Sequence, residues 1–199
     1  MKAPAAIFLD RDGTINVERN YLYKYEDWEW LPGVIEAIKR FNEAGFLVLV
    51  VSNQAGIARG FYTAWDVDHL HATIDTELAR YGARIDAYYY CPHHPDFGEQ
   101  TPCDCRKPAP GLLLRAQKQW GVDLRQSFLI GDKADDIKAG EAAGVTPILV
   151  ATGYGSEQKP LVRADTLCVD DISAAVRFIF GRTHAHRAAL SHVGRSDVL

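Results

Sequence analysis

Residues 5–14 read AAIFLDRDGT, and this stretch decides the fold. Its short apolar first half predicts a buried β-strand, and two carboxylates, Asp10 and Asp12, follow that strand at once. Gly13 permits the sharp turn that such a strand end needs. Because side chains alternate along a strand, Asp10 and Asp12 are expected on one side and Arg11 on the other. The sequence therefore predicts two neighbouring carboxylates at the carboxyl end of a buried strand.

Such a carboxylate pair needs a partner, because two like charges held close together repel each other unless a cation or a shared proton relieves them. A hard cation such as Mg²⁺ suits oxygen ligands of this kind. An Asp-Gly turn with a capping aspartate is common after a strand and requires no metal. Two aspartates at this spacing, directly after a buried strand, favour the cation site over the simple turn.

Outward from this stretch, short apolar runs alternate with segments of helical spacing. The further strands predicted are Phe46–Val51, Asp86–Tyr90, Ser127–Ile130, Thr146–Ala151 and Thr166–Val169. The predicted helices are residues 34–44, 63–81, 112–120, 135–143 and 172–180. This alternation predicts an α/β fold with a Rossmann-like, three-layer α/β/α parallel sheet.

Ligands of such sheets bind at the carboxyl ends of the strands, so polar residues are expected to collect there. The sequence meets this expectation. The polar residues that follow predicted strands are Asp10, Asp12, Ser52, Asn53, Cys91 and Asp132. The functional site is therefore expected at this edge of the sheet.

Composition excludes several classes of protein. The chain has 199 residues, of which 47% are hydrophobic and 24% charged, so it can bury a core and is not disordered. Its net charge of −4 gives no basic surface for a nucleic-acid backbone. No apolar run approaches the length of a membrane span, and the N-terminal apolar stretch lacks a cleavage pattern. We therefore expect a cytoplasmic protein with neither nucleic acid nor membrane as partner.

A second group of chemically distinctive residues lies in one loop. Cys91, Cys103 and Cys105 crowd together in a mid-sized chain without a signal peptide, which favours a metal site over disulfides. Three thiolates and one imidazole suit a structural tetrahedral Zn²⁺. A long loop with no helix or strand also needs an internal staple. From composition alone, either His93 or His94 can be the fourth ligand.

These motifs together resemble those of the haloacid dehalogenase-type phosphatases. Residues 10–14 match the family's first motif, and Ser52 follows the second predicted strand as the second motif requires. Lys107 stands before a helix, as in the third motif, and Gly131-Asp132 with Asp136 resembles the fourth. One motif alone is weak evidence, whereas four in order, each at the end of an element, are strong.

The resemblance implies a role for each of these residues. Asp10 would be the nucleophile that forms an aspartyl-phosphate, and Asp12 the general acid and then the general base. Catalytic Mg²⁺ would be held by the side chains of Asp10 and Asp132 and by the backbone carbonyl of Asp12. The groups that would hold the phosphoryl oxygens are Ser52, the Asn53 backbone and Lys107. The family pattern also selects the structural zinc ligands Cys91, His93, Cys103 and Cys105.

The resemblance covers about residues 5–152 and implies one phosphatase domain, which we place at residues 1–180. The zinc loop would span residues 91–105. Neither this loop nor residues 16–30 are long enough for a large cap domain, so both are expected to form small rims around an open site. Residues 181–199 are predicted to be a loosely docked or flexible tail. A monomer is expected for such an open domain.

Within the superfamily, residues 52–60 (SNQAGIARG) and 105–108 (CRKP), with the zinc loop, resemble the heptose-bisphosphate phosphatase family. That resemblance implies removal of the C7 phosphate from a heptose 1,7-bisphosphate in the synthesis of lipopolysaccharide or S-layer heptose. An arginine fork can bind a second phosphate, and Arg106 is the first choice for this role. Arg59 is the second choice, with equal weight on a solvated loop charge. Gln54 is also predicted to bind substrate.

Three alternatives remain open at this point. A histidinol-phosphate phosphatase would share the fold, the zinc loop and the catalytic aspartates. A non-catalytic zinc protein that binds a phosphorylated ligand would not need the acid–base pair of Asp10 and Asp12. A polynucleotide 3′-phosphatase is disfavoured by the acidic net charge. The partner predicted is therefore a small sugar bisphosphate.

Overall fold

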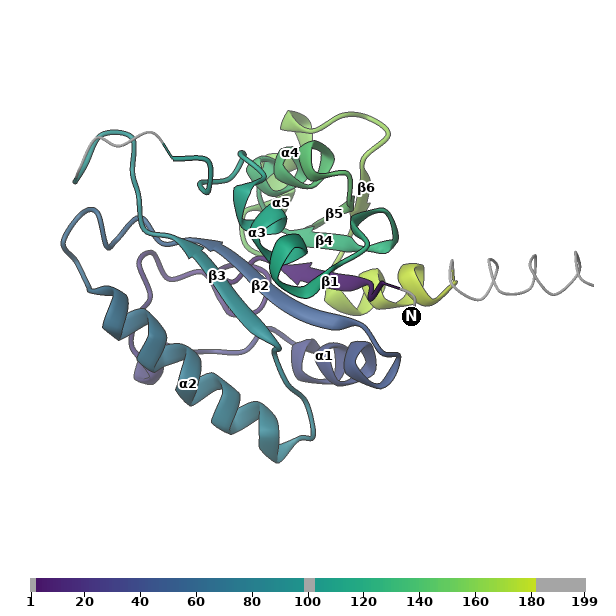
Figure 1. Ribbon diagram of the computed structural model, residues 1–199, viewed down its shortest axis with the longest axis horizontal. Coiled ribbons are helices and arrows are strands. Elements are labelled where there is room, and N and C mark those ends of the chain that lie inside the picture. The colour runs from purple at the N-terminus through teal and green to yellow at the C-terminus, as the bar shows by residue number, and fades with distance from the viewer. Residues whose placement is uncertain (1–2, 99–102, 182–199) are drawn as a thin grey trace, which may run out of the picture.

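A computed structural model describes residues 3–98 and 103–181 of the chain (Figure 1). In the described residues, six strands form one sheet in the order β3-β2-β1-β4-β5-β6, and every neighbouring pair is parallel. The strands are β1 Ala6–Leu9, β2 Leu47–Asn53, β3 Ala87–Cys91, β4 Phe128–Gly131, β5 Thr146–Val150 and β6 Leu167–Val169. The predicted parallel α/β sheet is confirmed, with strand bounds shifted by a residue or two.

The helices also follow the predicted alternation. They are α1 Val34–Glu43, α2 Ala64–Arg80, α3 Gly111–Trp120, α4 Ala134–Ala143 and the short α5 Gly155–Gln158, followed by helical residues 172–181. Thr63 begins α2 with a reciprocal cap, in which its backbone N–H donates to Asp66 and its hydroxyl accepts from the Asp66 N–H. No helix in the described part of the chain is long and apolar enough to cross a membrane.

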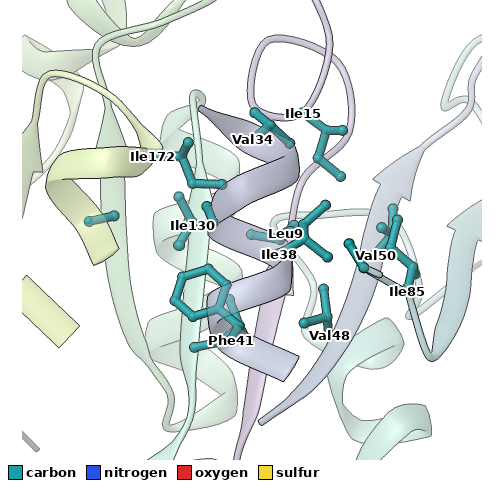
Figure 2. Packing of buried hydrophobic residues seen from close by; sticks show 14 of the residues in the cluster. Leu9, Ile15, Val34, Ile38, Phe41, Val48, Val50, Ile85, Ile130 and Ile172 are labelled. Atoms are coloured by element: carbon teal, nitrogen blue, oxygen red, sulfur yellow. The ribbon is translucent and has the colours of Figure 1, made fainter. Parts of the chain in front are cut away.

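The sheet separates two apolar layers, because successive residues of β1 point to opposite faces. Ile7 and Leu9 pack with α1, α2 and helical residues 172–181, as Figure 2 shows around Leu9, Ile38 and Val50. The alternate residues of β1 pack with α3 and α4 on the other face. This arrangement is the predicted three-layer α/β/α sandwich.

Strand order places the site. The chain moves outward from β1 to β2 and β3 in one direction and to β4, β5 and β6 in the other, so β1 lies at the switch point of the sheet. The backbone N–H of Asp10 continues the ladder by donating to the Ile130 carbonyl at 2.9 Å. Gly13 has a φ of +84°, and a Cβ at this position would lie 2.2 Å from an Asp132 oxygen. Glycine is therefore required where the turn after β1 meets the loop after β4.

The described rim segments form no separate domain. Residues 16–30, between β1 and α1, contain one 3₁₀ turn at Tyr25–Asp27 and isolated bridges. The predicted tail lies outside the described residues from 182 onward, and Gly181, its first predicted residue, still belongs to the last helical segment.

Candidate active site

Lys107 joins two buried carboxylates at the carboxyl end of β1. Its Nζ donates to Asp10 Oδ1 at 2.7 Å and to the Val51 carbonyl at 2.7 Å, and it lies 2.5 Å from Asp136 Oδ1. Burial alone would lower the pKa of Lys107, but the charges of Asp10 and Asp136 outweigh it and the pKa is raised. The ammonium is therefore a fixed positive charge beside Asp10.

Asp132 completes a cluster of three buried carboxylates. One oxygen each of Asp10, Asp132 and Asp136 lie within 4.8 Å of one another. Oδ2 of Asp132 accepts from the Tyr154 N–H at 2.9 Å, whereas its Oδ1 is buried with no hydrogen-bond partner. Burial and the charge of Asp10 raise the pKa of Asp132 to about 8, and burial raises that of Asp136 to about 6.

The donor set fits a hard divalent cation. Three buried carboxylates lie together, with the Lys107 ammonium bonded to two of them, and the raised pKa values of Asp132 and Asp136 reflect negative charge that is costly to bury. Oδ1 of Asp132 accepts no hydrogen bond and is therefore free to bind a cation, and Mg²⁺ binds oxygen ligands of this kind. Asp136, which sequence analysis did not name as a ligand, belongs to the cluster. Its Oδ1 already contacts the Lys107 ammonium, and its Oδ2 accepts from the Lys133 backbone N–H. Asp10 and Asp132 therefore remain the better ligands.

The Asp12 carboxylate is held apart from this cluster by three donors. Arg11 Nη2 lies 2.9 Å from Oδ2, Asn16 Nδ2 donates to Oδ1 at 3.0 Å, and Gln54 Nε2 donates to Oδ2 at 3.2 Å. Burial alone would raise the pKa of Asp12, but the charge of Arg11 and these hydrogen bonds together lower it. The sequence predicts Arg11 on the side of the strand opposite the two aspartates; its guanidinium nevertheless reaches the Asp12 carboxylate just beyond Leu9, where β1 ends.

The end of β2 contributes Ser52 and Asn53. Ser52 is buried, and its Oγ accepts from Gln54 Nε2 at 2.7 Å, which leaves the hydroxyl proton able to donate. The Asn53 side chain makes two bonds of 3.0 Å with the backbone N–H and C=O of Lys107. The Asn53 side chain therefore ties the loop before α3 to the end of β2.

The Gln54 side chain is fully engaged within the protein. Its amide nitrogen donates to Asp12 and Ser52, and its Oε1 accepts from the Tyr62 hydroxyl at 2.7 Å. The predicted contact of Gln54 with substrate stays a prediction, and the side chain also holds Asp12 and Ser52 in place. Tyr62 was not anticipated. Gly56 lets its ring approach, since a Cβ there would lie 2.2 Å from the ring.

The two candidate arginines have different surroundings. Arg106 directly precedes Lys107, and its Nη1 donates to the His93 carbonyl at 3.2 Å. Arg59 lies 4.0 Å from the ring centre of Phe97, and its Nη2 is 3.1 Å from His94 Nε2. Arg106 thus stands next to the buried lysine, whereas Arg59 joins parts of the rim.

The predicted zinc ligands come together. Cys91 Sγ lies 3.8 Å from Cys103 Sγ and 3.5 Å from His93 Nδ1, and Cys105 Sγ lies 3.4 Å from the same nitrogen. A tetrahedron with Zn–S bonds of about 2.3 Å has sulfurs roughly 3.8 Å apart, so this group fits Zn²⁺. His94 binds Arg59 instead, which resolves the choice left open by the sequence in favour of His93.

Lys133 is a further cation that sequence analysis missed, although it directly follows Asp132. Its Nζ lies 3.2 Å from Glu18 Oε2. Burial alone would lower the pKa of Lys133, but the charges of Asp10, Asp132 and Glu18 raise it. The sequence feature that could have identified Lys133 is its position one residue after the motif aspartate Asp132.

The parallel sheet and the carboxylates at its switch point agree with the predicted haloacid dehalogenase-like (HAD) class of hydrolases. A family model described as HAD-hydrolase-like matches residues 104–175. Asp10, Asp12 and Ser52, which resemble the first two motifs of that class, lie before the matched range.

Relatives narrow this class. A protein of Photorhabdus laumondii named D-glycero-beta-D-manno-heptose-1,7-bisphosphate 7-phosphatase is 45% identical to this chain, and the match covers 74% of this chain and 81% of that protein. The protein of the same name in Escherichia coli K12 is 44% identical, and that match covers 76% of this chain and 82% of the relative. A solved D,D-heptose 1,7-bisphosphate phosphatase from B. bronchiseptica, complexed with magnesium and phosphate, superimposes with a TM-score of 0.82 at 32% identity and covers 89% of this chain and 99% of its own. The chain belongs to this heptose-bisphosphate phosphatase family, whose enzymes are phosphoric monoester hydrolases.

Proposed function

We propose that the protein removes the C7 phosphate of D-glycero-β-D-manno-heptose 1,7-bisphosphate through a phosphorylated Asp10. The observation that carries the proposal is the buried bond between Lys107 and Asp10 at 2.7 Å, beside the unpaired oxygen of Asp132. The β-anomer is the one in the names of the relatives. The product would serve the synthesis of the heptose of lipopolysaccharide or an S-layer.

In the first step, an Asp10 oxygen attacks phosphorus while Lys107 holds the carboxylate at Oδ1. The Asp10 O–P bond forms, the bond from phosphorus to the C7 oxygen breaks, and Asp12 gives its proton to that oxygen. The low pKa of Asp12 in the free protein suits a base, and the dianionic phosphate of an arriving substrate would raise its proton affinity. Asp12 would therefore become protonated as substrate binds.

In the second step, Asp12 takes a proton from water, whose oxygen attacks the phosphorylated Asp10 and releases inorganic phosphate. The Ser52 hydroxyl, the Asn53 backbone N–H and Lys107 would orient the phosphoryl oxygens in both steps. Mg²⁺, held by Asp10, Asp132 and the Asp12 carbonyl, would neutralise phosphoryl charge.

The second phosphate of the substrate would be bound by Arg106. Arg106 directly follows the zinc-loop residue Cys105, and its guanidinium donates to the His93 carbonyl. A zinc-bound loop would therefore fix the position of this guanidinium. Structural zinc would therefore act on substrate selection through the backbone of the loop. A substrate with one phosphate would leave this guanidinium without its anion.

The test is phosphate release by the wild-type protein with Mg²⁺. We compare both anomers of the heptose 1,7-bisphosphate with histidinol phosphate. The proposal expects a large kcat/KM advantage for the β-bisphosphate. An advantage for histidinol phosphate would replace the proposed substrate, and no release from any of the three would overturn the proposed activity.

The covalent step has its own test. Acid quenching during turnover of a bisphosphate radiolabelled at the phosphorus of its C7 phosphate should trap label on the wild-type protein but not on Asp10→Asn. The Asp10→Asn variant is expected to stay folded and to keep its zinc, because Asp10 lies outside the cysteine cluster. Substantial turnover by this variant would remove Asp10 as nucleophile.

A further inference from the structure

Arg11 is the bulkiest fully buried side chain in the described part of the protein, with 1% of its surface exposed. Its Nε lies 3.2 Å from both oxygens of Asp12, and its Nη2 lies 3.1 Å from Oδ1 and 2.9 Å from Oδ2. The same Nη2 donates to the Leu22 carbonyl at 2.6 Å. The guanidinium thus joins the carboxylate after β1 to the rim segment, residues 16–30.

Stability alone is a poor explanation for this buried cation. Taking a guanidinium out of water is costly, and a buried ion pair often contributes no more to stability than well-packed apolar residues of the same volume. One guanidinium nitrogen, Nη1, is also buried with no hydrogen-bond partner. The bonds that Arg11 does make are concentrated on Asp12 and on the rim.

The geometry distinguishes Arg11 from the other donors to Asp12. Asn16 bonds one carboxylate oxygen and Gln54 bonds the other, each through a single neutral N–H. Arg11 contacts both oxygens through two nitrogens of one rigid plane. A planar group that contacts both oxygens restricts rotation of the carboxylate about its Cβ–Cγ bond more strongly than either single bond does.

We propose that Arg11 is a positioning residue for catalysis: it fixes the orientation in which Asp12 exchanges protons with the leaving oxygen and with the attacking water. This inference rests on the proposed function, because it requires Asp12 to be the acid and base. The hydrogen bonds of the Arg11 side chain go to Asp12 and to the Leu22 carbonyl, so Arg11 would act on the reaction through Asp12. Its bond to Leu22 also fixes the rim segment relative to the same carboxylate.

The consequence is specific to proton transfer. Expulsion of a sugar oxygen needs the proton that the Asp12 O–H bond releases, whereas expulsion of p-nitrophenolate from p-nitrophenyl phosphate does not. Loss of Arg11 should therefore slow the first turnover of the sugar ester far more than that of the aryl ester. A loss of folded protein would slow both equally.

The experiment measures single-turnover and steady-state kinetics of Arg11→Met and Arg11→Lys, each loaded with Mg²⁺ and zinc. We expect Arg11→Met to lower kcat for the heptose bisphosphate roughly 100-fold with KM changed less than about 3-fold, since misplaced catalytic groups cost on this order. The lysine, which keeps the charge, should recover about tenfold. The first-turnover release of p-nitrophenolate should change less than about 3-fold.

Arg19→Met is the matched control, because Arg19 lies in the same rim segment and pairs with the exposed Glu29 rather than with a site carboxylate. Its kcat is expected to stay within about twofold of wild type. Circular dichroism and zinc content confirm folding, and Arg11→Lys carries the test if Arg11→Met does not fold. Full activity in either folded Arg11 variant, or equal losses for both esters, would overturn the inference. Failure of the proposed function would instead appear in the wild type, as no phosphate release.

Discussion

His71 is a buried histidine whose replacement by phenylalanine should make the folded protein less sensitive to acid. It lies on α2 with 4% of its surface exposed, and its ring stacks on that of Tyr88 with centres 4.0 Å apart. Its Nε2 is buried with no hydrogen-bond partner. Burial, reinforced by the charge of Arg11, lowers the pKa of His71 to about 3. Phenylalanine would keep the stacked ring and remove the nitrogens.

The sign of the effect follows from proton linkage. A histidine in the unfolded chain titrates near pH 6.5, so between about pH 6.5 and pH 3 the unfolded state binds a proton that the folded state does not. Above that range His71 imposes no such cost, and the cost grows as the pH falls. At pH 5, about 1.5 units below the unfolded pKa, it amounts to about 2 kcal/mol of lost unfolding free energy, at about 1.36 kcal/mol per unit.

Urea unfolding at pH 7 and pH 5 measures this cost. For each protein, the unfolding free energy at pH 5 is subtracted from that at pH 7, and this difference should be about 2 kcal/mol smaller for His71→Phe than for wild type. Contributions of carboxylates shared by both proteins cancel in the comparison. His69→Phe, an exposed position on the same helix, is the control. Equal pH differences in wild type and His71→Phe would refute the reasoning.

Three further predictions concern the site. Cys103→Ser should abolish stoichiometric zinc binding and lower the melting temperature, and unchanged metal content by mass spectrometry would contradict a structural zinc. Arg106→Ala should raise KM for the heptose bisphosphate at least about tenfold more than for a sugar monophosphate, because only the former offers a second anion. An equal rise in KM for both substrates would show that Arg106 does not bind the second phosphate. Asp136→Asn should lower kcat about 10- to 100-fold with zinc retained, because Lys107 loses one of its two carboxylate partners. An unchanged kcat would show that Asp10 and Val51 suffice to hold the lysine.

The position of the site could be predicted from the sequence because that position depends on where the strands end, which hydrophobic periodicity indicates. Short apolar runs fixed where the strands end, and parallel strands bring those ends to one edge of a sheet. Asp10, Ser52 and Asp132 therefore had to lie near one another once the alternation of strands and helices was recognised. Lys107 was assigned to this site from the motif resemblance, and in the structure its Nζ donates to Asp10.

Side-chain destinations followed no such rule. Arg11 was expected to point away from Asp12, but its side chain is long enough to reach that carboxylate once the regular strand has ended. Gln54 was predicted to bind substrate, and nothing in its sequence position indicated that its amide bonds Asp12 and Ser52. The group that orients this amide is Tyr62, eight residues further on in a loop, a distance that neither helical nor strand periodicity connects.

Arg59 shows why two alternatives drawn from a sequence can both be incomplete. The sequence offered a phosphate ligand or a solvated loop charge. In the structure its guanidinium stands over Phe97 and 5.7 Å from the ring centre of Tyr21, with a bond to His94. It therefore connects the rim segment after β1 with the loop that carries the zinc ligands. Because such a bridge needs both sides in place, loss of zinc would displace the rim segment through Arg59. It would also move Arg106, which is bonded to the His93 carbonyl, so the zinc loop would shape the site in two ways.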